Sequence, residues 1–136
     1  DAATQAAMSD GWFHTGDLGR RDEEGFLYIV GRREEMILSS GENIYPGEVE
    51  RALQSLPQVR EAAVVGMPDA KRGEAVAAFV LLQPDARLEE QALLNALQGK
   101  IAPYKMPRKV LFVENFPRNQ AGKVLKRILK KRLENR

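Results

Sequence analysis

Residues 31–50 read GRREEMILSSGENIYPGEVE and join two parts of the chain that differ in pattern. The stretch opens on Gly31, becomes apolar at 36–38 and breaks at 39–41, where two serines precede a glycine. Pro46 then suits the first turn of a helix, where its missing N–H costs no hydrogen bond. Because the patterns before and after it differ, the stretch predicts a joint between two structural units.

The residues before the joint predict a β-hairpin. Its arms are 18–22 and 26–30, and Gly25 suits the positive-φ position that closes the turn between them. Residues 1–10 have no clear period and predict an irregular lead-in. A lone hairpin is only marginally stable in water, so this one requires a partner surface, which we expect to lie outside the chain.

The residues after the joint predict a compact α+β unit, with a small mixed sheet flanked by helices in the order β-α-β-β-α-β-α. Apolar residues recur at helical spacing in three segments, and β-rich runs separate them. The expected elements are a strand at 36–38, a helix from Pro46 to Pro57, strands at 59–67 and 75–82 with 68–69 and Gly73 in the loop between them, a helix at 88–97, a strand at 109–114 and a helix at 124–133.

Composition limits the classes of protein and site. A chain of 136 residues with 43% apolar residues is sufficient for one domain with a core. The absence of cysteine excludes disulfides, thiolate catalysis and cysteine-based zinc sites. No apolar run approaches the about 20 residues of a membrane span, and no signal peptide is evident. These features predict a cytoplasmic protein without a membrane span.

Charge is concentrated at one end of the chain. The net charge is only +2, yet residues 100–136 contain 12 basic and 2 acidic residues. Such a segment could meet nucleic acid, an anionic membrane or a phosphorylated ligand. A solvated helix face explains the same charges equally well at this point.

Three positions are candidates for chemistry. Asp17 follows a glycine and could be a turn former, or a carboxylate that accepts hydrogen bonds from a sugar diol. Lys123 is expected at the start of the last helix, where the helix dipole disfavours a cation, so this position favours contact with an anion. The small residues at 39–41 could form only a turn, or could let a thin ligand pass close to the backbone.

Three motifs, in order, resemble those of the adenylate-forming superfamily, which includes acyl-CoA synthetases, carrier-protein-loading domains and luciferases. WFHTGDLG at 12–19 resembles its ribose-binding motif, the stretch at 31–50 its hinge motif, and APYKMPRKVLFVENFPRNQAGKVLKR at 102–127 its closing motif. The GENIYP continuation resembles CoA ligases of the acyl, benzoyl or succinylbenzoyl kind. The chain therefore resembles the C-terminal portion of an AMP-binding acyl-CoA synthetase or fatty-acid–CoA ligase.

The resemblance implies a division of the chain and a set of site residues. Residues 1–33 would be the tail of a large N-terminal AMP-binding domain, and 34–136 the mobile C-terminal lid domain. The implied roles are nucleotide binding for Asp17 and Arg32, the hinge for Glu34, adenylation catalysis for Lys123, and the CoA passage for Ser39, Ser40, Gly41, Glu42 and Asn43.

The chain departs from the usual motifs at four positions. Glu34 stands where aspartate or lysine is usual, and Ser40 where glycine is common. Asn119 and Ala121 replace a frequent threonine and a frequent serine or threonine near Lys123.

The family reaction implied is ATP-dependent. A carboxylate and ATP give acyl-AMP and pyrophosphate, and CoA then takes the acyl group and releases AMP. The phosphate loop, the acyl pocket and the Mg²⁺ ligands are expected in the chain's own N-terminal domain, its predicted partner, and no metal site is predicted within the 136 residues. The fragment alone is therefore predicted to be inactive.

Two other functions compete with CoA ligation. An adenylation domain could transfer the acyl group to a carrier protein instead. A basic module could bind nucleic acid through residues 100–136, but the charges of the last helix have no aromatic platform among them. That alternative also gives Asp17 and Arg32 no role, so the sequence favours the ligase and predicts no nucleic-acid partner.

Overall fold

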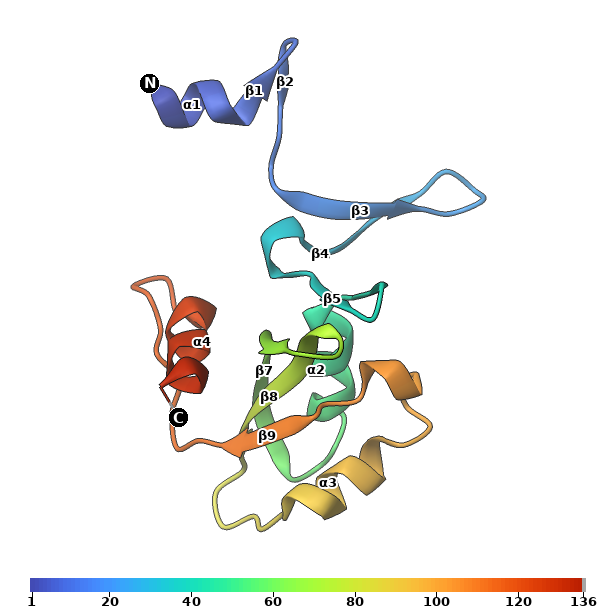
Figure 1. Cartoon of the computed structure of the whole chain (residues 1–136), viewed down its shortest axis with the longest axis vertical. Coiled ribbons are helices and arrows are strands. Elements are labelled where there is room, and N and C mark those ends of the chain that lie inside the picture. The colour runs from blue at the N-terminus through green and yellow to red at the C-terminus, as the bar shows by residue number, and fades with distance from the viewer. Residues whose placement is uncertain (136) are drawn as a thin grey trace.

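The N-terminal quarter of the chain forms two hairpins that extend away from the rest of the molecule (Figure 1). The structure, a computed structural model, describes residues 1–135. The elements of this part are α1 (Ala2–Ala7), β1 (Met8–Ser9), β2 (Trp12–Phe13), β3 (Asp17–Arg21) and β4 (Leu27–Arg32).

The predicted hairpin is confirmed as the antiparallel pair β3–β4. Asp22 organises its turn, because its Oδ1 accepts hydrogen bonds from the backbone N–H of Glu24 at 3.0 Å and of Phe26 at 2.9 Å. The Tyr28 hydroxyl donates to Oδ2 at 3.0 Å. Desolvation opposes ionisation of Asp22, but these hydrogen bonds favour the carboxylate and together lower its pKa.

The prediction of an irregular lead-in at residues 1–10 is wrong. Asp1 caps α1 by accepting a hydrogen bond from the N–H of Thr4 at 2.8 Å. A tight turn then joins β1 to β2, with positive φ at both Asp10 (50°) and Gly11 (82°). Both turn residues of a type I′ hairpin require this conformation, and Asp-Gly is a favoured pair for it.

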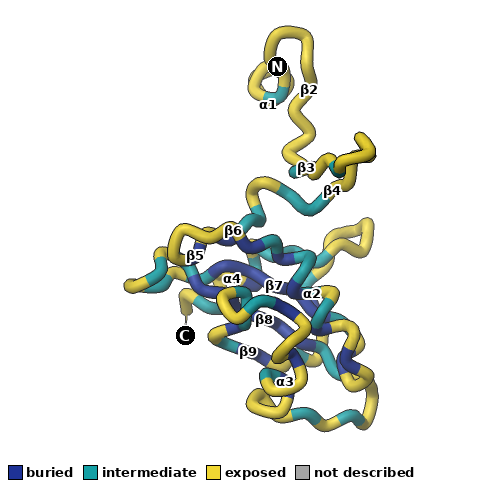
Figure 2. Tube along the Cα trace, turned by 90° about the vertical axis from the view of Figure 1, so that its right-hand side faces the viewer, coloured by how far each residue is buried: buried dark blue, intermediate teal, exposed yellow. Residues whose placement is uncertain are grey.

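Neither hairpin contributes to a core. No residue of 1–36 is buried, and the first buried residue is Ile37 (Figure 2). Five large apolar side chains of the two hairpins are between 61% and 76% exposed: Trp12, Phe13, Phe26, Leu27 and Ile29. This apolar surface fits the expectation that the hairpins pack against a partner surface.

The remaining residues form a mixed sheet with helices on both faces, which confirms the predicted α+β class. The sheet order is β6-β5-β8-β7, and β9 pairs in parallel with β8. The elements are η1 (Arg33–Glu35), β5 (Ile37–Ser39), β6 (Glu42–Ile44), α2 (Pro46–Gln54), β7 (Val59–Asp69), β8 (Gly73–Leu82), α3 (Glu90–Leu97), η2 (Pro103–Lys105), β9 (Lys109–Phe112) and α4 (Lys126–Glu134).

After residue 36, the observed order contains one strand that was not predicted. β6 follows β5 through a two-residue turn in which Ser40 and Gly41 have φ values of 51° and 82°. A three-residue strand is too short to show a period, so the stretch at 39–45 looked like a simple break. The strands β7 and β8 are also longer than expected, and they include Pro68, Asp69 and Gly73, which were assigned to a loop.

Two apolar clusters fill the two faces of the sheet, because successive strand residues point to opposite sides. In β7, Ala62 and Val64 join the cluster beneath α2 and α3, whereas Ala63 and Val65 join the cluster beneath α4. Leu129 is the buried residue of α4 and lies in the second cluster. The sheet therefore holds α2 and α4, from opposite faces, in one unit (Figure 1).

An ion pair between η2 and α2 predicts a measurable pH dependence of stability. Lys105 Nζ lies 2.7 Å from Oε2 of Glu48, and the lysine side chain is only 17% exposed. The hydrogen bond to Glu48, against some desolvation, raises the pKa of Lys105 above the usual 10.5. A raised folded-state pKa gives stability that is present below the unfolded pKa and is lost as pH rises through the folded pKa.

We therefore expect Glu48→Gln to lower the melting temperature at pH about 8, with a difference from wild type that shrinks as pH rises above about 10.5. Thermal denaturation of both proteins across this range measures the effect. A difference that stays constant through pH about 11.5 would contradict the assigned role of the pair.

Candidate functional site

The two predicted nucleotide-binding residues lie side by side on neighbouring strands. Asp17 and Arg32 are register partners in the β3–β4 hairpin, and Arg32 Nη1 lies 2.9 Å from Asp17 Oδ1. The same nitrogen donates to the carbonyl oxygen of Thr15 at 3.0 Å. The hydrogen bond to Asp17 and its charge raise the pKa of Arg32. The pair is thus a fixed carboxylate–guanidinium unit.

This unit keeps unused hydrogen-bonding capacity. Within residues 1–135, Oδ2 of Asp17 makes no hydrogen bond, and the Asp17 side chain is 32% exposed. Nε of Arg32 is buried and has no hydrogen-bond partner among the described residues. The second carboxylate oxygen of Asp17 is free to accept hydrogen bonds, which suits a polar ligand with hydroxyl groups, whereas the buried Nε of Arg32 is not open to such a ligand.

The predicted hinge residue lies in η1, directly after this unit. The N–H of Arg33 donates to the carbonyl of Gly16 at 2.8 Å, which attaches the start of η1 to the hairpin. The Glu34 side chain is 77% exposed and lies 3.9 Å from Arg32 Nη2. The next residue, Glu35, contacts Lys126 of α4 at 3.3 Å, so the attachment changes from the hairpin to the domain within three residues.

Three of the five residues predicted for the CoA passage line one small pocket. Ser39, Ser40 and Glu42 border a cavity of about 90 Å³, whereas Gly41 and Asn43 do not line it. The N–H of Ser40 donates to the carbonyl of Arg72 at 2.9 Å, which fixes the β5–β6 turn against the β7–β8 turn. The other lining residues are Arg72, Ala75, Val76, Tyr104, Met106 and Arg108. Sequence reasoning did not identify the two arginines.

Lys123 lies in a tightly bonded loop. Asn119 Oδ1 accepts a hydrogen bond from the N–H of Lys123 at 2.9 Å, and the Asn119 N–H donates to the Lys123 carbonyl at 2.9 Å. Arg118 donates to the carbonyl of Gly122 at 3.0 Å and also pairs with Glu61 of β7. Asn119, which departs from the usual motif, is therefore the side chain that closes this loop.

The predicted position of Lys123 at the start of the last helix is wrong. α4 begins at Lys126, and Lys123 lies three residues before it. The helix dipole acts within the first turn, so it does not disfavour a cation at Lys123. The dipole therefore gives no argument for contact with an anion. Lys123 is exposed, and no ion pair joins it to any of residues 1–135, so its ammonium group is free to meet an anion.

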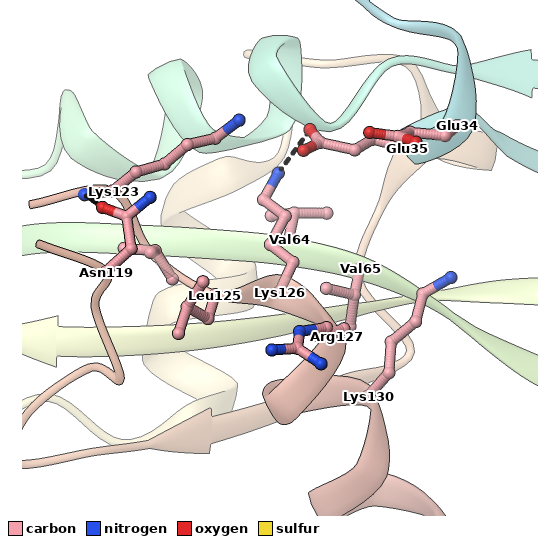
Figure 3. Close-up of a pocket in the computed structure, with 11 residues that line it drawn as sticks. Glu34, Glu35, Val64, Val65, Asn119, Lys123, Leu125, Lys126, Arg127 and Lys130 are labelled. Carbon is pink, nitrogen blue, oxygen red and sulfur yellow. Dashed lines mark hydrogen bonds and ion pairs between the residues drawn. The ribbon is translucent and has the colours of Figure 1, made fainter. Parts of the chain in front are cut away.

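The Lys123 loop and the predicted hinge segment border the same pocket (Figure 3). This open cavity of about 440 Å³ is lined on one side by Glu34 and Glu35 and on the other by Lys123 and the first half of α4. Figure 3 shows the Lys126 side chain pointing toward Glu35. The structure therefore brings together two predicted site residues that are 89 positions apart in the sequence, Glu34 and Lys123.

The described residues contain neither a metal-binding cluster nor a membrane-spanning helix. Among residues 1–135, no group of three or more histidine or acidic side chains is arranged to hold a metal ion. Within the same residues, no helix has the length and apolar content needed to cross a bilayer.

A sequence model of the AMP-binding enzyme C-terminal domain matches residues 48–123, more than half of the chain. The chain belongs to this family. The match includes α2 from Glu48 onward, the whole of β7 to β9 and the loop that ends at Lys123.

Similar proteins extend the match to nearly the whole chain. The 2-succinylbenzoate–CoA ligase of Bacillus cereus (strain AH820) is 48% identical over 132 residues, which is 97% of this chain and 27% of the ligase. The long-chain-fatty-acid–CoA ligase FadD13 of Mycobacterium tuberculosis (strain CDC 1551 / Oshkosh) is 46% identical over 128 residues, or 94% of this chain and 25% of that enzyme.

A solved structure supports the same relationship in three dimensions. The o-succinylbenzoate CoA synthetase MenE of Bacillus subtilis, in complex with the acyl-adenylate intermediate OSB-AMP, superimposes with a TM-score of 0.87 at 42% identity. The alignment covers 93% of this chain and 26% of that protein. The chain thus spans about a quarter of the length of the CoA ligases that it matches.

Proposed function

We propose that this chain is the C-terminal part of an ATP-dependent acyl-CoA ligase. The observation that carries the proposal is the arrangement of two pockets on one domain. One pocket is bordered by Lys123 and the hinge residue Glu34, and the other by Ser39, Ser40 and two arginines, and no lining residue is shared. A domain that turns about its hinge could present these two surfaces in succession.

In the first half-reaction, a carboxylate attacks the α-phosphorus of ATP, and pyrophosphate leaves. Negative charge builds up on the phosphoryl oxygens, and the free ammonium of Lys123 can stabilise it. Asp17 accepts hydrogen bonds from the ribose hydroxyls, and Arg32 holds the Asp17 carboxylate in position at 2.9 Å. The OSB-AMP complex of the similar synthetase supports an acyl-adenylate intermediate, the product of this step.

In the second half-reaction, the thiol of CoA attacks the acyl carbon, and AMP leaves. The pocket beside Ser39 and Ser40 is narrow, as a pantetheine chain requires, and Arg72 and Arg108 at its edge can pair with phosphate groups. The backbone contact between Ser40 and Arg72 holds the two sides of this passage together.

We propose that residues 1–33 are the tail of the large N-terminal domain and that 34–136 are the mobile domain. The exposed apolar residues of the hairpins support this division, because they need a surface that the chain itself does not supply. The large domain would contribute the acyl pocket, the phosphate loop and the Mg²⁺ ligands. A cytoplasmic location belongs to the same proposal.

The test uses an enzyme-length protein that contains this chain, with a panel of succinylbenzoate, long-chain and short-chain carboxylic acids. We expect carboxylate-dependent pyrophosphate release with ATP and acyl-CoA formation when CoA is added. The matched control is the isolated 136-residue chain, which we expect to release no pyrophosphate. Acyl transfer to a carrier protein but not to CoA would favour the alternative acceptor, and release by the isolated chain would contradict the proposed division.

A further inference from the structure

A cluster of three charged side chains connects the hinge segment to two helices of the domain. Lys126 Nζ at the start of α4 lies 2.6 Å from Glu50 Oε1 in α2 and 3.3 Å from Glu35 Oε2 in η1. The three side chains are between 19% and 26% exposed. Glu50 Oε1 also accepts a hydrogen bond from the N–H of Val64 at 3.0 Å, so the cluster is attached to the central sheet.

The other side of the hinge is attached to the β3–β4 hairpin. Arg32 pairs with Asp17 at 2.9 Å, and the N–H of Arg33 donates to the carbonyl of Gly16 at 2.8 Å. The backbone between the Arg33 N–H and the side chain of Glu35 consists only of the remaining atoms of Arg33 and of Glu34. The local contacts of these two residues are a 3.4 Å hydrogen bond from Met36 N–H to the Arg33 carbonyl and the 3.9 Å contact of Glu34 with Arg32.

These attachments define how many backbone torsions can change when the domain turns. A hinge moves at the residues that are not held by either rigid body. With Glu35 held by Lys126, the change is restricted to Arg33 and Glu34. If Glu35 were released, the free segment would extend toward Ile37, the first buried residue of the core.

The cluster also connects the hinge to the Lys123 loop. Lys126 is three residues after Lys123, and the loop ends where α4 begins. A contact from Lys126 to Glu35 therefore determines where the loop lies relative to the pivot. Figure 3 shows Glu34, Glu35, Lys123 and Lys126 around one pocket.

We propose that Lys126 is a positioning residue that clamps Glu35 to the mobile domain, so that rotation takes place at Arg33 and Glu34 and moves Lys123 as part of one rigid body. This inference rests on the proposed two-step ligase function. It assigns Lys126 no contact with substrate.

The most selective variant is Glu35→Gln, because it removes the charge of one partner and leaves the 2.6 Å pair of Lys126 with Glu50 intact. The matched control is Glu48→Gln, which makes the same chemical change in another lysine–glutamate pair, 2.7 Å long against 3.3 Å for Glu35 and Lys126. Hydrogen exchange of the peptide 33–38, measured in the enzyme-length protein, reports the clamp without any need for activity.

We expect Glu35→Gln to speed exchange in this peptide about fivefold, with the melting temperature changed no more than in Glu48→Gln. Glu48→Gln should leave exchange in the peptide unchanged. Equal exchange in wild type and Glu35→Gln would overturn the clamp.

The half-reactions give the second measurement. Lys126→Met should lower pyrophosphate release about tenfold more than thioester formation from supplied acyl-AMP, and Lys126→Arg should restore most of the difference. Equal loss in both steps, or no rescue by arginine, would overturn the positioning role. If Glu35→Gln speeds hydrogen exchange in peptide 33–38 but the wild-type enzyme forms no acyl-adenylate, the proposed function is refuted. The contact between Lys126 and Glu35 would then still be supported as a clamp.

Discussion

Lys123→Ala should lower the rate of acyl-adenylate formation by about 10²–10³-fold in the enzyme-length protein, while thioester formation from supplied acyl-AMP stays near wild type. The variant removes the free ammonium group of Lys123. Within residues 1–135, Lys123 has no ion-pair partner, and its exposed side chain makes no core contact, so the fold should not change. The effect is therefore expected on the chemical step alone.

The magnitude follows from where the charge acts. A preorganised donor that meets charge only as it develops in the transition state contributes about 3–4 kcal/mol in a water-poor site. The loop is built for such fixed placement, because Asn119 bonds to both backbone groups of Lys123 and Arg118 holds the carbonyl of Gly122. The second step has its charge on a different group and should not need this lysine.

The matched control for Lys123→Ala is Lys130→Ala, which removes another lysine that lines the same pocket. It should reduce adenylation by less than about threefold, because a general loss of positive charge at an exposed site is screened by solvent. Pyrophosphate release and thioester formation are measured separately for both variants. Equal loss of both steps in Lys123→Ala would contradict the adenylation role.

Local sequence signals predicted most elements of the domain correctly. The helix that begins at Pro46 and the long apolar strands had clear patterns, and the structure confirms them. The β1–β2 hairpin was missed although Asp10-Gly11 is a strong turn signal, because the flanking strands have only two residues each and show no alternation.

The contacts around Lys123 could not be predicted by the same means. Glu35 and Lys126 are 91 residues apart, and each looks like an ordinary charged residue of its segment. Their meeting depends on how the sheet places η1, α2 and α4, which is a property of packing and not of local pattern. The roles of Asp17, Arg32 and Lys123 came from the resemblance to a family. The structure adds that Asp17 and Arg32 are paired and that Lys123 precedes α4.

Leu129→Ala should lower the free energy of unfolding of the domain by about 2–5 kcal/mol. Leu129 is 0% exposed and lies among Ala63, Val65, Ala77, Phe79, Leu111 and Phe116 on one face of the sheet. It is the buried residue of α4, so its truncation leaves a cavity at the centre of the contact that docks this helix. Urea denaturation of the 136-residue chain measures the loss.

Leu38→Ala is the matched control, because it makes the same chemical change at a side chain that is 50% exposed, and it should cost less than about 0.5 kcal/mol. Leu129→Met, which nearly conserves volume, should cost less than about 1.5 kcal/mol and keeps the test valid if the alanine variant does not fold. A loss for Leu129→Ala no larger than that for Leu38→Ala would mean that α4 is not docked on the sheet. Because α4 carries Lys126 and follows the Lys123 loop, its docking is the physical condition under which the loop keeps a fixed position relative to the proposed hinge in η1.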